Sequence, residues 1–301
     1  MNEKINLNNL PSIKGKYKIA EPLKKYTWLN VGGPADVMFL PADIEDLQFF
    51  LQNLDMQIPV FILGGGSNLL VRDKGIRGVV IKLQAQSFAK WNIEDNTFYC
   101  GCGMLNNKLK DIVISNNLGG LEFLCSIPGT IGGALRSNAG CFGNEISDVL
   151  QNALVINRQG KIFKVMHDDF HFAYRHSEFP ADWIVLQVGL KYSSKTSKEI
   201  ADKIQEHSEY RKTHQPQGIR TAGSTFKNPQ GQRAWELIKN SGAAELTVGG
   251  VKMSPQHCNF LFNDGTATAA DIEQLCDKIT DVVKKTYNTD LELEICKVGQ
   301  E

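Results

Sequence analysis

The sequence contains no hydrophobic run long enough to cross a membrane. None of its apolar stretches approaches the ~20 residues that a spanning helix needs. The first residues, Met1 to Asn6, also lack the apolar core of a signal peptide. We therefore expect a cytoplasmic protein that does not associate with membranes.

The chain also lacks a net charge. Its 33 lysines and arginines balance its 33 aspartates and glutamates, which argues against broad binding to nucleic acids or anionic lipids. Apolar residues make up 42% and charged residues 22%, as in an ordinary soluble globular protein. With 301 residues, the chain has material for about two domains.

Cysteine pairs with metal-binding spacing are missing. The seven cysteines are an odd number, are scattered, and form no Cys-x-x-Cys motif. Paired cysteines would indicate disulfides or a zinc site. We therefore expect free thiols in a reducing compartment, and no metal site.

Two glycine clusters lack the spacing of the familiar nucleotide-binding loops. The first, 64–68, follows an apolar run but has neither the Gly-x-Gly-x-x-Gly nor the Gly-Lys-Ser/Thr pattern. The second, 119–143, holds seven glycines with apolar anchors between them, unlike a flexible linker. Successive amides in glycine turns bind anions. We interpret the clusters as a cradle for a phosphate-bearing ligand; the alternative is tight turns between strands.

Hydrophobic periodicity predicts a mixture of helices and strands in two parts. Helices are expected at 44–54 behind an Asp43 N-cap, at 105–116, from Thr196 towards Arg211, at 233–241, and after Thr268. Strands are expected at 37–40, 58–63, 79–83, 153–157, 161–166, 183–190 and 291–298. The first thirty residues show no clear pattern. The polar break after Tyr192 suggests domains at 1–192 and 193–301.

Three further polar segments contain candidates for chemistry. Arg175 stands among aromatic residues and is suited to pair with a carboxylate or phosphate; a surface ion pair is the alternative. Ser224 lies between small residues in a locally basic region, without the Gly-x-Ser-x-Gly elbow of a serine nucleophile; a solvated turn is the alternative. Glu292 and Glu294 alternate onto one face of the last expected strand, where a carboxylate held in a site could share or relay a proton; a solvated edge-strand face is the alternative.

In their order, these segments resemble the UDP-N-acetylenolpyruvoylglucosamine reductase family from about Thr27 to Gly299. The motifs that carry the resemblance are 31–35, 63–71, 120–123, 127–134, 138–140, 174–177, 222–229 and 257–260. The chain is similar to the compact branch, which lacks an inserted substrate-clamping loop. It departs from the family pattern at Cys125-Ser126, at Ser137, and at Phe142, where tyrosine is usual.

The resemblance implies an α+β fold: a two-subdomain FAD-binding domain of the PCMH (vanillyl-alcohol-oxidase-like) type, then a smaller α+β substrate domain. It also implies FAD as cofactor, NADPH as hydride donor, and a UDP-sugar enolpyruvyl ether as substrate in peptidoglycan precursor synthesis, with no obligate protein partner. The implied catalytic residues are Arg175, Ser224 and Glu294. The implied FAD contacts are Gly64, Gly65, Gly66, Ser67, Asn68, Pro128, Gly129, Thr130, Gly132, Gly133 and Ala139. The implied substrate contacts are Arg220, Lys227 and Asn228.

In this family pattern, Arg175 and Glu294 would stabilise negative charge on the substrate carboxylate, with Glu294 protonated, and Ser224 would deliver a proton. Two alternatives stay open. A different FAD oxidoreductase, acting on another acid or alcohol, would lack the 222–229 segment. A flavin-binding or sugar-nucleotide-sensing protein with a dead site would have lost Arg175, Ser224 or Glu294, but all three are present.

Overall fold

The computed structural model describes residues 9–300, which group into two compact units. Unit 1 comprises 9–19, 37–65 and 78–209, and unit 2 comprises 20–36, 66–77 and 210–300. No helix in this described part is long and apolar enough to cross a membrane. Each unit has its own hydrophobic core.

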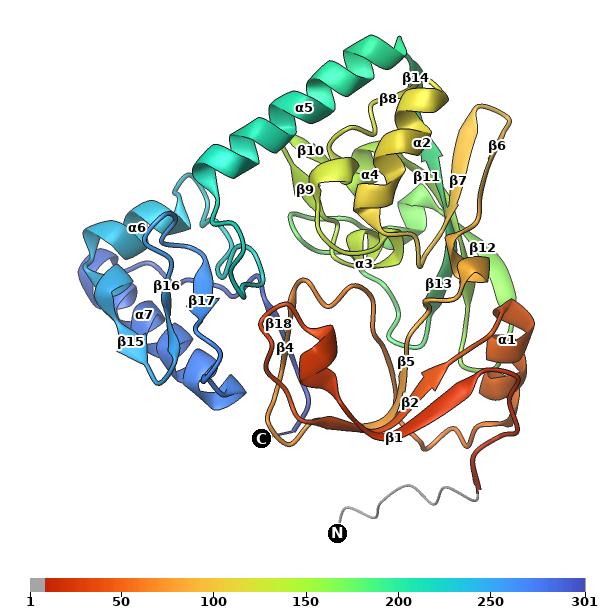
Figure 1. Cartoon of the computed structure of the whole chain (residues 1–301), viewed down its shortest axis with the longest axis horizontal. Helices are drawn as coiled ribbons and strands as arrows, with labels where there is room; N and C mark the ends of the chain where they lie inside the picture. The colour runs from red at the N-terminus through yellow and green to blue at the C-terminus, as the bar shows by residue number, and fades with distance from the viewer. Residues whose placement is uncertain (1–8, 301) are drawn as a thin grey trace. The chain divides into compact units, whose positions relative to one another are not determined.

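The larger sheet of unit 1 is antiparallel and has five strands (Figure 1). Its order is β12 (Ile162–Met166), β11 (Leu150–Ile156), β13 (Ile184–Lys191), β7 (Thr97–Gly101) and β6 (Trp91–Glu94). Helix α3 (Ile131–Arg136) packs against β13 and β7. Also in unit 1 are α2 (Leu109–Ser115), α4 (Ile146–Val149) and the short antiparallel pair of β8 (Leu118–Gly119) with β14 (Ser193–Ser194).

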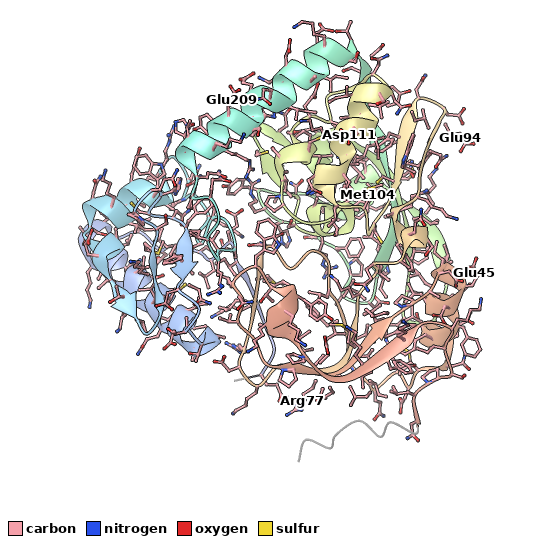
Figure 2. All side chains as sticks on the ribbon, viewed as in Figure 1. Glu45, Arg77, Glu94, Met104, Asp111 and Glu209 are labelled. Atoms are coloured by element: carbon pink, nitrogen blue, oxygen red, sulfur yellow. The ribbon has the colours of Figure 1, made fainter. Side chains whose placement is uncertain are left out.

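A second sheet has four strands and is associated with helix α1. Its order is β1 (Lys16–Pro22), β2 (Pro34–Leu40), β5 (Ile76–Ile81) and β3 (Val60–Ile62). Helix α1 (Ile44–Asn53) begins where the Asp43 carboxylate accepts the Asp46 amide at 2.7 Å. The helix buries Phe50, whose ring centre lies 4.3 Å from that of Phe39, and leaves Glu45 exposed at the outside (Figure 2).

Unit 2 is built around helix α7 and a small antiparallel sheet. The sheet order is β15 (Thr247–Val248), β16 (Val251–Met253) and β17 (Leu261–Asn263). Helix α7 (Ala269–Tyr287) starts with a capping box between Thr268 and Asp271, and it packs against β15, β16 and α6 (Ala234–Asn240). The parallel pair β4 (Leu69–Val71) and β18 (Cys296–Val298) completes the unit.

The long helix α5 (Ser197–His214) explains why unit 1 extends beyond the expected boundary at 192 and 193. Ile200 and Ile204 of α5 are buried in the unit 1 core, so the division between units falls after Glu209. This grouping describes packing rather than function, and the predicted functional domains 1–192 and 193–301 stay a prediction. The capping interaction expected between Thr196 and Glu199 at the start of α5 is present.

The helices predicted by periodicity are confirmed, whereas the predicted strand 291–298 is wrong over most of its length. Only β18 forms there. The residues before it lie beside 224–227, to which they are joined by an isolated bridge between Phe226 and Leu293. A single bridge to an irregular segment does not make a ladder, so the apolar–polar alternation of 291–295 is not accompanied by a strand.

Candidate functional site

The two glycine clusters meet at Gly65 and Gly129. A Cβ atom built on Gly65 would lie 2.6 Å from the Cα of Gly129, so the two backbones are in direct contact. On Gly64, it would lie 3.1 Å from the Thr130 hydroxyl oxygen. Strand β3 leads into the first loop, and Thr130 caps the start of α3. We call this pair of loops the glycine cradle (64–65 and 129–130). That the two loops hold a phosphate-bearing ligand stays a prediction.

The glycine cradle has backbone amides available for an anion. Within residues 9–300, the amides of Gly64, Gly65, Gly129 and Thr130 donate to no protein acceptor. Converging unpaired amides bind phosphate well because each supplies a partial positive charge and a hydrogen. These residues therefore fit the pyrophosphate of the expected FAD.

Two side chains beside the cradle were missed by sequence reasoning. Lys82 donates its Nζ to the Gly64 carbonyl at 2.8 Å, and burial lowers the pKa of its ammonium. Asn106 is fully buried, its amide donates to the Gly129 carbonyl, and both polar atoms of its side chain lack partners in the described residues. An orphaned buried amide next to the cradle is what a polar ligand would satisfy. Neither residue belongs to a pattern that sequence alone singles out.

Other predicted FAD contacts have mixed surroundings. The Gly132 amide donates to the Cys102 carbonyl at 2.9 Å, and a Cβ there would lie 2.9 Å from that of Cys102, so this glycine lets α3 pack closely. The Gly133 amide is bonded to Thr130, and the Ala139 amide to Ala134. Figure 2 labels Met104, whose carbonyl accepts the first amide of α3. FAD contacts at Gly132, Gly133, Ala139 and the exposed Pro128 stay predictions.

In unit 2, the rest of the first cluster is tied to the region of Glu294. A Cβ on Gly66 would collide with the Tyr26 carbonyl at 1.8 Å, and its φ of +65° favours glycine. Asn68 donates from Nδ2 to the Glu294 carbonyl at 2.9 Å and accepts the Cys296 amide at 3.0 Å. Ser67 lies between Gly66 and Asn68 in the same loop. The loop 66–68 is therefore bonded to the segment that carries a predicted catalytic residue.

Arg175 is held in unit 1 by the hairpin of β9 (Gly140–Cys141) and β10 (Asn144–Glu145). Its Nη1 donates to Glu145 Oε1 at 2.9 Å, and its Nη2 to the Gly140 carbonyl at 2.8 Å. Gly140 and Glu145 are register partners in the hairpin. Arg175 itself has a φ of +54°, a conformation that costs a non-glycine residue energy and commonly marks functional sites.

The buried side chain of Asn138 fixes the Glu145 carboxylate. Asn138 Nδ2 donates to Glu145 Oε2 at 2.8 Å and to the Ala173 carbonyl at 2.9 Å, while its Oδ1 accepts the Ser147 amide. Each oxygen of Glu145 thus has its own donor, and the carboxylate orients the guanidinium. Sequence reasoning missed Glu145, because it lies outside the family motifs.

The chain segments that carry Ser224 and Glu294 are bonded to each other in unit 2. The Glu294 amide donates to the carbonyl of Thr225, the residue after Ser224, at 2.8 Å. Within the described chain, the half-exposed Ser224 hydroxyl makes no hydrogen bond. Beside it, Gly223 has a φ of +78° and open space around its Cα. A hydroxyl in an open setting is accessible to a substrate.

Asn259 is the residue that sequence reasoning named in a motif but gave no role. It is buried, its Oδ1 accepts the Phe226 amide at 3.0 Å, and its Nδ2 donates to the Phe226 carbonyl at 2.9 Å. Its own carbonyl accepts the Thr225 amide at 2.7 Å. These three bonds fix the backbone that follows Ser224.

The predicted substrate contacts have protein partners. Lys227 is paired with the exposed Glu292 at 2.6 Å, Asn228 accepts the Ala234 amide at the start of α6, and the exposed Arg220 packs against Gly265. An ion pair with an exposed carboxylate is weak enough for a competing anion to replace it. Their roles as substrate contacts stay predictions.

The cysteines are free thiols, and within residues 9–300 no group of three or more metal-ligating side chains is found. Cys125 is one of the departures from the family pattern. Burial, followed by the charge of Glu122, raises the pKa of its thiol to about 12. It is therefore a protonated, inert side chain at neutral pH.

Two family models match the chain. Residues 35–166 match an FAD binding domain, and residues 215–298 match the C-terminal domain of UDP-N-acetylenolpyruvoylglucosamine reductase. The glycine cradle lies in the first match, and Ser224 and Glu294 lie in the second. Residues 167–214 lie outside both matches, so the matches do not decide where in this range the domain boundary falls.

Similar proteins match over nearly their whole length. UDP-N-acetylenolpyruvoylglucosamine reductases from Maricaulis maris and Wolbachia pipientis are 42% and 38% identical, over 98% and 97% of this chain and 95% and 99% of their own. The crystal structure of the reductase from Thermus caldophilus has a TM-score of 0.81 and 34% identity, covering 95% of this chain and 99% of its own. These matches confirm the expected α+β fold with an FAD-binding domain.

Proposed function

This chain belongs to the UDP-N-acetylenolpyruvoylglucosamine reductase family, and on that premise we propose that Arg175, Ser224 and Glu294 carry its reaction. The reaction is the NADPH-dependent reduction of UDP-N-acetylenolpyruvoylglucosamine to UDP-N-acetylmuramate, a step in peptidoglycan precursor synthesis. The enzyme is an FAD-dependent oxidoreductase. The observation that supports the assignment of residues is the bonding of the Ser224 and Glu294 segments to each other.

FAD is held, in this proposal, by the glycine cradle, with its pyrophosphate on the amides of Gly64, Gly65, Gly129 and Thr130. Asn106 offers a further donor and acceptor beside the cradle. Bound there, FAD supplies the chemistry of hydride transfer from NADPH to the substrate. The protein's contribution is to place the substrate and to stabilise the charge that develops on it.

Arg175 and Glu294 meet the substrate carboxylate in this mechanism. Hydride addition to the terminal carbon of the enolpyruvyl group leaves negative charge that extends onto the carboxylate. A guanidinium has five N–H donors, and bonds to Gly140 and Glu145 fix its plane before the substrate arrives. A preoriented donor of this kind typically contributes about 3 kcal/mol to transition-state stabilisation.

Ser224 delivers the proton. The carbon next to the carboxylate needs one proton to balance the hydride, and the Ser224 hydroxyl stands in an open setting next to a glycine. A serine is a weak acid, so it passes on a proton that it regains from water or a neighbour. The rigid backbone after Ser224, fixed by Asn259, keeps that hydroxyl in place.

Lys227, Asn228 and Arg220 are proposed to contact the UDP part of the substrate. Their segment is locally basic in a chain with no net charge. Binding of a diphosphate would replace the exposed partner of Lys227, Glu292. We further propose a cytoplasmic location, in keeping with seven free cysteines and a reducing compartment.

The first test of the proposed function is the colour of the bound flavin. Purified protein should be yellow, should bleach on addition of NADPH without oxygen, and should regain its colour with the enolpyruvyl sugar nucleotide. A colourless preparation that no flavin reconstitutes would refute the assignment.

Ser224→Ala tests the residue roles. The variant should bind FAD and bleach with NADPH at the normal rate, while its reoxidation by the enolpyruvyl substrate should nearly cease. The reaction has two halves, reduction of the flavin by NADPH and its reoxidation by the enolpyruvyl substrate. The matched control is Ser241→Ala, which removes a hydroxyl bonded to the Ile238 carbonyl and should preserve both half-reactions. Normal turnover in Ser224→Ala would exclude the role given to Ser224.

A further inference from the structure

The hairpin that holds Arg175 has an unusual residue at its tip. The two residues that link β9 to β10 are Phe142 and Gly143, with φ of +54° and +78°. Two consecutive positive φ values indicate a type I′ turn, in which Asn-Gly is the favoured pair. A bulky aromatic residue pays a steric cost in this conformation, so its presence calls for a compensating contact.

That contact is the ring of His207, on helix α5. The Phe142 and His207 rings are stacked, with centroids 3.9 Å apart and planes within 4° of parallel. His207 is 3% exposed. The stack therefore clamps the tip of the hairpin to a long helix whose neighbouring turns are anchored in the unit 1 core by Ile200 and Ile204.

The same short hairpin carries both bonds to Arg175. One runs from the guanidinium to the Gly140 carbonyl and the other to the Glu145 carboxylate, and these two residues are paired across the hairpin. Only the pair of Cys141 with Asn144 lies between them and the turn that carries Phe142. A movement of the tip would therefore displace the Gly140 carbonyl and the Glu145 carboxylate, which bind the guanidinium.

His207 contributes a neutral ring rather than a charge. Burial, followed by the positive charge of Lys203, lowers the pKa of its imidazole, against opposing effects of Glu206 and Glu122. Lys195 and Glu199 line the cavity beside it. Its Nδ1 has no hydrogen-bond partner in the described residues. The imidazole also has a hydrogen bond with the backbone of Glu122, which a carbocyclic ring would lose. The stack on Phe142 needs only a flat ring, so a carbocyclic ring of similar shape preserves the stack.

We propose that His207 is a positioning residue, whose stack with Phe142 holds the β9–β10 hairpin so that Arg175 meets the substrate carboxylate. The inference rests on the proposed function of Arg175. It assigns helix α5, which carries none of the proposed catalytic residues, a part in the second half-reaction.

Three variants separate stacking from folding. His207→Leu removes the ring and keeps an apolar side chain of moderate size. His207→Phe keeps a ring and should restore whatever His207→Leu loses. Phe142→Asn removes the stack from the other side but installs the Asn-Gly pair that a type I′ turn prefers, so it should not destabilise the turn.

Stopped-flow measurements without oxygen follow the two half-reactions. His207→Leu and Phe142→Asn should each slow flavin reoxidation by the enolpyruvyl substrate about tenfold or more, as small displacements of positioning groups do. Bleaching by NADPH should not change, and His207→Phe should be close to wild type. The double variant should be no slower than the slower single variant, because both changes remove one contact.

Wild-type reoxidation in His207→Leu would overturn the inference, as would equal slowing of both half-reactions or multiplied effects in the double variant. A readout independent of catalysis is hydrogen exchange of residues 138–147. It should be faster in His207→Leu and normal in His207→Phe, and unchanged exchange in His207→Leu would also overturn it. If the wild-type flavin is not reoxidised by the substrate, the proposed function fails, while the exchange data still decide whether the stack holds the hairpin.

Discussion

Replacing Gly65 by alanine should destabilise the protein and weaken FAD binding. The new Cβ would lie 2.6 Å from the Cα of Gly129 and 3.2 Å from its carbonyl carbon. Carbon atoms in contact prefer a separation of about 3.5–4.0 Å, so the two loops must move apart by about 1 Å. Gly65 is not among the residues with positive φ, so this cost comes from space rather than backbone conformation.

The expected magnitude follows from that overlap. Forcing an extra methyl group into a packed site costs about 1–3 kcal/mol, which should appear in urea unfolding of the apoprotein. The same displacement moves the amides of Gly129 and Thr130 away from those of Gly64 and Gly65. Fluorescence titration should therefore show FAD affinity lower by about tenfold or more, equivalent to about 1.4 kcal/mol.

Gly133→Ala is the matched control for stability. Its Cβ would lie 3.5 Å from the Thr130 hydroxyl oxygen, an ordinary contact, and alanine stabilises a helix by roughly 0.5–1 kcal/mol relative to glycine. Its apoprotein should unfold at the same or a higher urea concentration than wild type. If Gly65→Ala is as stable as Gly133→Ala, the reasoning about contact between the loops is refuted.

Three further changes have separate expected outcomes. Thr268→Ala removes the capping box of α7 and should lower the free energy of unfolding by about 1 kcal/mol; an unchanged urea midpoint would contradict it. Asn259→Leu leaves the Phe226 amide and carbonyl without their partners, which should cost about 2–3 kcal/mol and slow turnover; normal values of both would show that the bonds are dispensable. The hydrogen bond from Arg72 lowers the pKa of Glu273, so its stabilisation is present above the usual glutamate pKa and is lost as pH falls through the folded value. Arg72→Met should be less stable at pH 7 by at most about 1 kcal/mol, with a difference that shrinks below about pH 4 in urea titrations; a difference independent of pH would contradict it.

Local signals in the sequence predicted the helices well. The Asp43 cap, the Thr196 capping interaction and the start of α7 after Thr268 depend on residues close in sequence, and all are present. The strands that were missed show why the rest is harder. In β1, no residue is fully buried and Ile19 is exposed, so burial does not follow the short alternation of polar and apolar residues at 16–19.

The candidate site was predictable where backbone geometry constrains residue type. Gly65 and Gly66 leave no room for a side chain, which is visible in sequence as a glycine cluster. Glu145, Lys82 and Asn106 could not be predicted, because their bonds to Arg175, to the Gly64 carbonyl and, from the Asn106 backbone amide, to the Gly129 carbonyl join segments distant in sequence. No local pattern encodes such a contact.

The parallel pairing of β4 with β18 has a consequence for synthesis of the chain. Unit 2 joins segments that the ribosome makes early to segments that it makes late: Asn68 bonds to Glu294 across 226 residues, and Leu29 to Asn263 across 234. Contacts between such distant residues form slowly because a long loop must close first. During translation, the apolar residues Leu29, Val31 and Leu70 therefore stay unpacked against the later part of their core, residues 222–295, while the intervening segments of unit 1 are synthesised. The nascent chain exposes part of a future core for most of its synthesis, so this region is where we expect chaperones to bind.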